Sequence, residues 1–126
     1  MRPGSIRERL ITMADNSNAD LVVAFSTASS PEEARRIANA LVTEQLAACV
    51  QIVDNIHSTY RWQGGIRSAA ESLLILKTRG DLLPLIESRL GELHSYELPE
   101  LVAVPIGQGA RPYLDWLLAS TRLNDR

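Results

Sequence analysis

The sequence predicts an α+β fold in which two helices lie on one face of an antiparallel sheet. Three features of the 126 residues indicate this fold. Apolar runs typical of buried strands alternate with two segments whose apolar residues recur at helical spacing. A turn signal at residues 63–65 (Gln-Gly-Gly) separates two runs rich in β-branched and aromatic residues, as in a hairpin. The resulting order, β-α-β-β-α-β followed by one more helix, is that of the split-βαβ, ferredoxin-like sandwich.

The first strand and helix are the most clearly marked. Residues 21–25 (LVVAF) form a continuous apolar run, which is typical of a buried strand. Residues 30–33 (SPEE) combine an N-cap serine, a proline at the first helical position and a glutamate at the third, so this capping box predicts the start of a helix. The apolar residues that follow share one helical face: Ala34, Ile37, Ala38, Leu41 and Val42.

The middle of the chain predicts the hairpin and the second helix. Residues 47–53 are expected to form the second strand, and residues 58–62 alternate as strands do. The return strand is expected to cover residues 72–78. Asp81 is then expected to cap a helix, in which Pro84 is harmless because its missing amide would have no partner within the helix.

The C-terminal part predicts one more strand and a short helix. Residues 101–105 (LVAVP) form an apolar run. Pro112 is expected to open the last helix, which carries Tyr113, Trp116 and Leu117. This helix is the addition to the ferredoxin-like arrangement.

Composition limits the class of protein. Residues 1–19 are polar and unpatterned, which predicts a disordered leader, and residues 20–122 are expected to form a single domain. A net charge of −2 gives neither a basic field for nucleic acid nor a polybasic patch for anionic lipid. No apolar run approaches the roughly 20 residues that span a bilayer. A single cysteine, Cys49, excludes an internal disulfide and fits a cytoplasmic protein.

Residues 93–100 (LHSYELPE) concentrate the chemistry of the chain. His94 is one of two histidines, and it lies beside the carboxylates of Glu97 and Glu100. Imidazole and carboxylate together suit zinc or copper, but a stable site needs three or four ligands. The alternative is a histidine hydrogen-bonded at a helix C-terminus, where its positive form would meet the helix dipole. Both interpretations stay open, and a neighbouring subunit could supply the missing ligands.

Cys49 and Lys77 are the other reactive candidates. Cys49 lies in an apolar strand, where a free cysteine usually behaves as a small hydrophobe, and no nearby cation is evident to activate it. Lys77 is the only lysine, and it ends an apolar run. Its ammonium is expected either to act as a base or anion ligand, or to form a structural pair with Glu97 or Glu100.

The aromatic residues predict an interface more readily than a pocket. Tyr60, Trp62 and Trp116 could line a cavity, but such side chains commonly anchor contacts between subunits. No Ser-His-Asp, HExxH or P-loop arrangement is visible in the sequence. The protein is therefore expected to have neither enzymatic activity nor an organic cofactor.

Five blocks of sequence resemble the CutA divalent-cation-tolerance family. In order, they are residues 45–51 (QLAACVQ), 58–64 (STYRWQG), 74–78 (LILKT), 93–100 (LHSYELPE) and 113–117 (YLDWL). The resemblance extends from about Leu21 to Thr121. It implies a tight homotrimer related in architecture to the PII signalling proteins, with a role in tolerance to copper and other divalent metals and no established enzyme activity.

The resemblance also implies where a site would lie. Family sites cluster at clefts between subunits, and the matching positions here are Cys49, Tyr60, Lys77, His94, Tyr96, Glu97 and Trp116. From these and the local chemistry, we expect His94, Glu97 and Cys49 to be the metal ligands. Lys77, Tyr60, Tyr96, Glu100 and Trp116 are expected to line the cleft.

The chain also departs from the family pattern. Ser95 replaces a proline, and some members carry a cysteine where this chain has Ser26 and a histidine where it has Leu93. Copper ligation in such members would rest on that cysteine, that second histidine and the histidine at position 94. Of these three groups, this chain retains only His94.

Three functions remain open from the sequence. The first is a trimeric protein of metal homeostasis that binds a divalent cation, copper or zinc, at clefts between subunits. The second is a PII-like sensor that binds a small anion through Lys77 and backbone amides. The third is a non-catalytic trimeric scaffold whose polar cluster holds the interface together.

Overall fold

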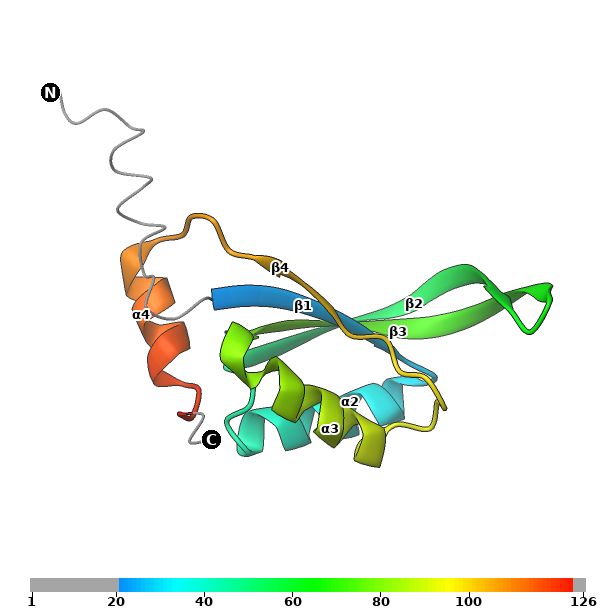
Figure 1. Cartoon of the computed structure of the whole chain (residues 1–126), viewed down its shortest axis with the longest axis horizontal. Coiled ribbons are helices and arrows are strands. Elements are labelled where there is room, and N and C mark those ends of the chain that lie inside the picture. Colours follow the sequence, from blue (N-terminus) through cyan, green and yellow to red (C-terminus); the bar gives the residue numbers. More distant parts are fainter. Residues whose placement is uncertain (1–20, 124–126) are drawn as a thin grey trace, which may run out of the picture.

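The computed structural model describes residues 21–123, so the predicted leader at residues 1–19 lies outside the described residues. Figure 1 shows the helices and strands along the chain. They are β1 (Leu21–Ala28), α2 (Pro31–Thr43), β2 (Cys49–Trp62), β3 (Gly65–Arg79), the 3-10 turn η1 (Gly80–Leu82), α3 (Leu83–Leu93), β4 (Val102–Pro105) and α4 (Arg111–Ala119). This order confirms the α+β class that the sequence predicts.

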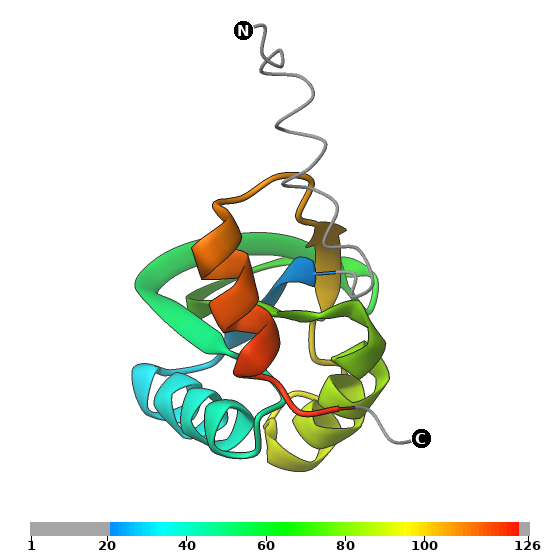
Figure 2. The same cartoon turned by 90° about the vertical axis from the view of Figure 1, so that its left-hand side faces the viewer.

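The four strands form one antiparallel sheet in the order β2-β3-β1-β4. Strand β3 lies between β1 and β2, and the connection from β1 to β2 runs through α2, which is the split-βαβ arrangement. Helices α2 and α3 lie side by side on one face of the sheet, and α4 lies at one end of it (Figure 2).

The hairpin strands are longer than predicted. The runs at 47–53 and 58–62 belong to one strand, β2, which continues through a β-bulge between Val53 and Ile56. Asn55 adopts a positive φ of 65° in this bulge, a conformation that asparagine tolerates better than most residues. Strand β3 begins at Gly65, before the predicted return strand at 72–78. The far half of the hairpin therefore projects as a two-stranded arm beyond β1 (Figure 1).

The tip of this arm is a two-residue turn, as residues 63–65 predict. Gln63 and Gly64 both have positive φ, and Trp62 pairs with Gly65 across the turn. Two positive φ angles are the mark of a type I′ turn, whose twist matches that of the strands it joins.

The prediction that Asp81 caps the second helix is wrong. Helix α3 begins at Leu83, and its first turn has no side-chain cap. Asp81 lies inside the preceding 3-10 turn, where its carboxylate accepts hydrogen bonds of 2.7 and 3.0 Å from Arg79. The extra turn shifts the helix start past the residue that the sequence marked as its cap.

The main core lies between the sheet and helices α2 and α3. Its largest fully buried side chains include Ile37, Leu41, Leu74, Leu76, Ile86 and Leu90. A smaller cluster forms where α4 meets the end of the sheet, through Leu21, Ala48, Leu114 and Leu117. Within residues 21–123, no helix has both the length and the apolar character needed to cross a membrane.

The sheet face opposite α2 and α3 is apolar and partly uncovered. Because side chains alternate along a strand, residues next to the buried Leu74 and Leu76 and the partly buried Ala103 point to this face. We call it the open face, and it includes Phe25, Leu73, Ile75, Val53, Val102 and Val104. Val102 is 57% exposed and Val104 50% exposed. Such a surface is typical of an interaction site.

Candidate functional site

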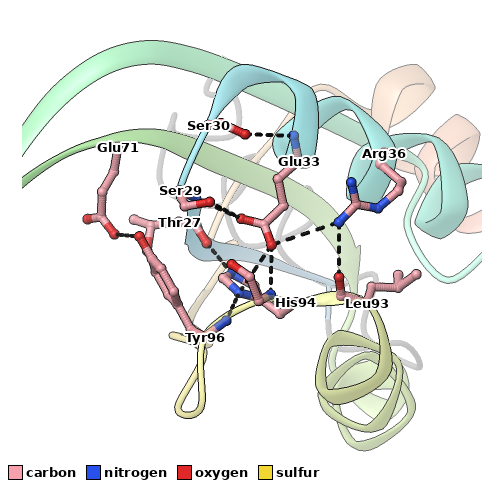
Figure 3. Close-up of polar contacts among 10 residues, drawn as sticks. Thr27, Ser29, Ser30, Glu33, Arg36, Glu71, Leu93, His94 and Tyr96 are labelled. Atoms are coloured by element: carbon pink, nitrogen blue, oxygen red, sulfur yellow. Dashed lines mark hydrogen bonds and ion pairs between the residues drawn. The ribbon is translucent and has the colours of Figure 1, made fainter.

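Glu33 is a buried carboxylate that joins the start of α2 to the segment after α3 (Figure 3). As predicted, Ser30 caps the helix, since its Oγ accepts a 3.1 Å hydrogen bond from the backbone N–H of Glu33. The return half of the capping box is shifted by one residue, because Glu33 Oε1 accepts from the N–H of Ser29 at 2.8 Å and from its hydroxyl at 2.7 Å. Glu33 Oε2 accepts from the N–H of Ser95 at 2.7 Å.

These hydrogen bonds determine the charge of Glu33. Burial by itself raises the pKa of the carboxyl, but the hydrogen bonds from Ser29 and Ser95 outweigh burial and lower the pKa from 4.5 to about 2. Arg36 lies 3.9 Å from Oε2, on the exposed side of the helix. Glu33 is therefore ionised at neutral pH and holds the backbone at Ser95 through a charge-assisted hydrogen bond.

His94 ends α3 and points into the protein. Its backbone N–H donates to the carbonyl of Leu90, and its ring is fully buried. Ring atom Nε2 lies 2.6 Å from the carbonyl oxygen of Thr27, and Nδ1 lies 3.0 Å from the backbone N–H of Tyr96. A carbonyl only accepts and an N–H only donates, so the ring is neutral in this geometry, with its proton on Nε2.

Both ring nitrogens of His94 are thus already in use. This arrangement matches the structural alternative for His94 in position, at a helix C-terminus, but the ring is neutral rather than positive. Coordination of a metal would require the ring to give up its contact with Thr27 or with Tyr96.

Tyr96 connects the segment after α3 to the hairpin arm. Its hydroxyl donates to Glu71 Oε2 at 2.5 Å, and its ring lies 4.6 Å from the His94 ring, centroid to centroid. Burial, and then the hydrogen bond to Glu71, raise the pKa of the Tyr96 hydroxyl, so it stays protonated. Figure 3 shows the chain of contacts from Glu71 through Tyr96 to His94 and Thr27.

A cavity of about 650 Å³ lies between the hairpin arm and this segment. We call it the Tyr96 cleft. It is lined by Thr27, Ser58, Thr59, Tyr60, Trp62, Glu71, Ser95, Tyr96, Glu97, Leu98 and Glu100. None of these lining residues is a lysine, arginine or histidine, whereas three are glutamates. Burial, and then the nearby charge of Glu71, raise the pKa of the Glu100 carboxyl. The cleft is acidic and aromatic.

Cys49, Lys77 and Trp116 lie elsewhere, in what we call the Lys77 cluster. Lys77 faces Cys49 across the ladder of β2 and β3, and its ammonium donates to Gln51 Oε1 at 2.9 Å. The same nitrogen lies 5.9 Å from the ring centre of Tyr113, which in turn contacts Trp116 at 5.4 Å. Cys49 is thus the strand partner of the single lysine, whose ammonium is bonded to Gln51.

Within one subunit, the predicted site is divided in two. The strand partner of Lys77 is Val23, four residues along β1 from Thr27, which is roughly 13 Å at the spacing of a strand. The proposed pair of Lys77 with Glu97 or Glu100 does not form, because Lys77 bonds Gln51 instead. Tyr60, Tyr96, Glu97 and Glu100 do share the cleft.

The predicted metal ligands are not gathered by a single chain. Across residues 21–123, no three or more His, Cys, Asp or Glu side chains are close enough to hold a metal ion together. Glu97 is exposed in the cleft, His94 is buried and does not line it, and Cys49 belongs to the Lys77 cluster. Ligation by His94, Glu97 and Cys49 therefore stays a prediction that needs a second subunit.

Comparison with known protein families shows which family the chain belongs to. A family model described as "CutA1 divalent ion tolerance protein" matches residues 22–120. The chain belongs to this family. The "Divalent-cation tolerance protein CutA" of Thermus thermophilus is 50% identical over 99 residues, which cover 79% of this chain and 96% of the relative. "Protein CutA, chloroplastic" of Arabidopsis thaliana is 44% identical over 80% of this chain, which spans 56% of that relative's length.

Solved structures of CutA1 proteins have the same fold. The CutA1 of Oryza sativa superposes with a TM-score of 0.81 at 41% identity, covering 83% of this chain and 96% of the other. The Thermus thermophilus "divalent cation tolerance protein" has a TM-score of 0.79 at 48% identity, covering 81% and 99%. The family is named for tolerance of divalent ions and not for a catalysed reaction.

Sequence reasoning missed Glu71 and Glu33 as parts of the site. Glu71 precedes the predicted return strand at residues 72–78, so that prediction assigns it to neither face of the sheet. The sequence predicts only a helix-capping role for Glu33, whereas its Oε2 also accepts a hydrogen bond from the N–H of Ser95. A signal for Glu71 did exist, since extending the alternation of β3 back to Gly65 would have placed it on the same face as Leu73.

Proposed function

We propose that this CutA family chain binds a divalent cation, copper or zinc, in the Tyr96 cleft and that it acts without catalysis in metal tolerance. The main support for this proposal is the charge of the cleft. Three glutamates and no cationic residue are among the residues that line it. Carboxylates near one another attract cations and repel anions. The names of the family and of its relatives refer to tolerance of divalent cations, which also supports cation binding.

The proposal includes assembly as a homotrimer, in which a neighbouring subunit completes the ligand set. The cleft of one chain offers Glu97 and Glu100 at its surface, too few donors for a stable site. The open face supplies a reason to assemble, because it exposes Val53, Val102 and Val104 to water. A neighbour could bring its Cys49 toward His94 and Glu97, and thiolate, imidazole and carboxylate suit copper or zinc.

The small-anion alternative would use a different surface. An anion is disfavoured in the Tyr96 cleft by its glutamates and would have to bind at Lys77, whose ammonium already contacts Gln51. A cytoplasmic location is a further part of the proposal, and it rests on the single Cys49. Relatives described as chloroplastic and periplasmic occur in Arabidopsis thaliana and Archaeoglobus fulgidus.

Calorimetric titration with Cu²⁺ and with Zn²⁺ tests cation binding. We expect the native protein to release binding heat and the Glu97→Gln variant to bind at least about tenfold more weakly, since a charged ligand oxygen is lost. Glu97 is exposed and the substitution preserves its shape, so the fold should be retained.

Asp115→Asn is the matched control for this titration. Asp115 is an exposed acid on α4, at the far end of the sheet, and its replacement removes the same charge without touching the cleft (Figure 1). Native affinity in Glu97→Gln, or equal weakening in both variants, would show that the cleft is not the metal site.

Sedimentation equilibrium tests the assembly. We expect the native chain to sediment at three times its own mass, and Val102→Glu to sediment as a smaller species, because a charge on the open face opposes its burial. Val42→Glu is the control, since Val42 is also an exposed valine but lies on α2, away from the open face. A native monomer would refute the trimer and with it the shared metal site.

A further inference from the structure

We infer that the Tyr96 cleft also takes an organic cation, namely a primary ammonium or guanidinium group joined to an apolar or aromatic body. This inference deepens the proposed function, because it concerns the same cleft and rests on the same negative charge. It names a different class of ligand from a bare metal ion.

The first argument is the buried carboxylate of Glu71. This residue is only 9% exposed, and its one hydrogen bond is from the Tyr96 hydroxyl to Oε2. Within residues 21–123, Oε1 of Glu71 accepts no hydrogen bond and the carboxylate forms no salt bridge, and this oxygen is not among the fully enclosed polar atoms, so it is open to solvent in the cleft. Buried carboxylates are normally paired with a cation. Glu71 therefore presents an unused acceptor to the cleft, which an N–H donor with positive charge would satisfy.

The second argument is the aromatic lining. Tyr60, Trp62 and Tyr96 all contribute to the cleft wall, together with Leu98. The faces of tyrosine and tryptophan rings attract cations, and this attraction strengthens when water is displaced. The same rings also offer apolar surface to the uncharged part of an organic ligand. A hydrated metal ion would gain little from such walls.

The third argument is size. As one subunit forms it, the cleft has a volume of about 650 Å³, which is within the range of sites for small organic molecules. Its glutamates do not form a group of three close enough to coordinate one ion in this subunit. An extended organic cation can contact the buried Glu71 and the exposed Glu97 or Glu100 without requiring them to converge.

Titration with benzylamine and with its neutral analogue benzyl alcohol tests this inference. We expect benzylamine to bind and to raise the melting temperature, while benzyl alcohol binds at least about tenfold more weakly because it lacks the charge. Glu71→Gln should weaken benzylamine binding by about tenfold or more. Trp62→Leu should weaken it by about threefold through loss of the cation–π contact. Asp115→Asn should leave the affinity unchanged.

The outcomes separate this inference from the proposed function. Equal binding of the amine and the alcohol, no binding of either, or native affinity in both Glu71→Gln and Trp62→Leu would overturn the organic-cation site. Binding of Cu²⁺ or Zn²⁺ without benzylamine would also overturn it and leave the metal proposal standing. Binding of benzylamine without either metal would support this inference and refute the metal proposal. Trp62→Leu keeps the test valid if Glu71→Gln does not fold.

Discussion

Replacing Glu33 by glutamine is expected to lower the free energy of unfolding at neutral pH by about 3 kcal/mol, the equivalent of its pKa shift from 4.5 to about 2. The variant keeps the size of the side chain but loses the negative charge of the carboxylate that accepts hydrogen bonds from the N–H groups of Ser29 and Ser95. Chemical denaturation of the native protein and the variant, followed by circular dichroism, measures the difference.

The contribution of Glu33 to the free energy of unfolding should decrease as the pH falls. Its folded-state pKa lies below the unfolded value, so its contribution to stability is complete above about pH 4.5 and is lost as the pH falls toward 2. The stability gap between the native protein and Glu33→Gln should therefore narrow between pH 5 and pH 2. Glu32→Gln is the control, because Glu32 is the exposed neighbour in the same helical turn. A gap that is constant over this range would contradict the role of the Glu33 charge.

Replacing His94 by alanine is expected to lower the free energy of unfolding by about 4 kcal/mol. The substitution empties the space of a fully buried ring and leaves the carbonyl of Thr27 and the N–H of Tyr96 without their partners. Thermal unfolding measures the loss. Reduced metal binding in His94→Ala would therefore be ambiguous, which is why Glu97→Gln is the better test of ligation.

The variants His94→Gln and His94→Asn distinguish the contribution of the Nε2 hydrogen bond from that of the Nδ1 hydrogen bond. The amide of glutamine can reach as far as Nε2 and donate to Thr27, whereas the shorter asparagine can accept from Tyr96 in place of Nδ1. Each is expected to recover part of the stability that alanine loses. If both variants are as unstable as His94→Ala, the packing of the ring and not its hydrogen bonds accounts for the effect.

Local sequence patterns specify the helices and strands and their order. The capping serine, the turn at Gln63 and Gly64, and the apolar periodicities are local patterns, and each produced the predicted structure because it acts through neighbouring residues. Local signals were weaker where the chain bends without ending an element. The bulge at Asn55 therefore looked like a gap between two strands.

Which residues share a site depends on how the helices and the sheet pack together. Glu33 and Ser95 are 62 residues apart in sequence, and His94 and Thr27 are 67 apart. Those contacts exist because α2 and α3 pack on the same face of one sheet, which no local pattern specifies. The same packing separates Lys77 from Glu97 and places Glu71 beside Tyr96. The acidic, aromatic cleft is thus a product of packing between segments that lie far apart in the sequence.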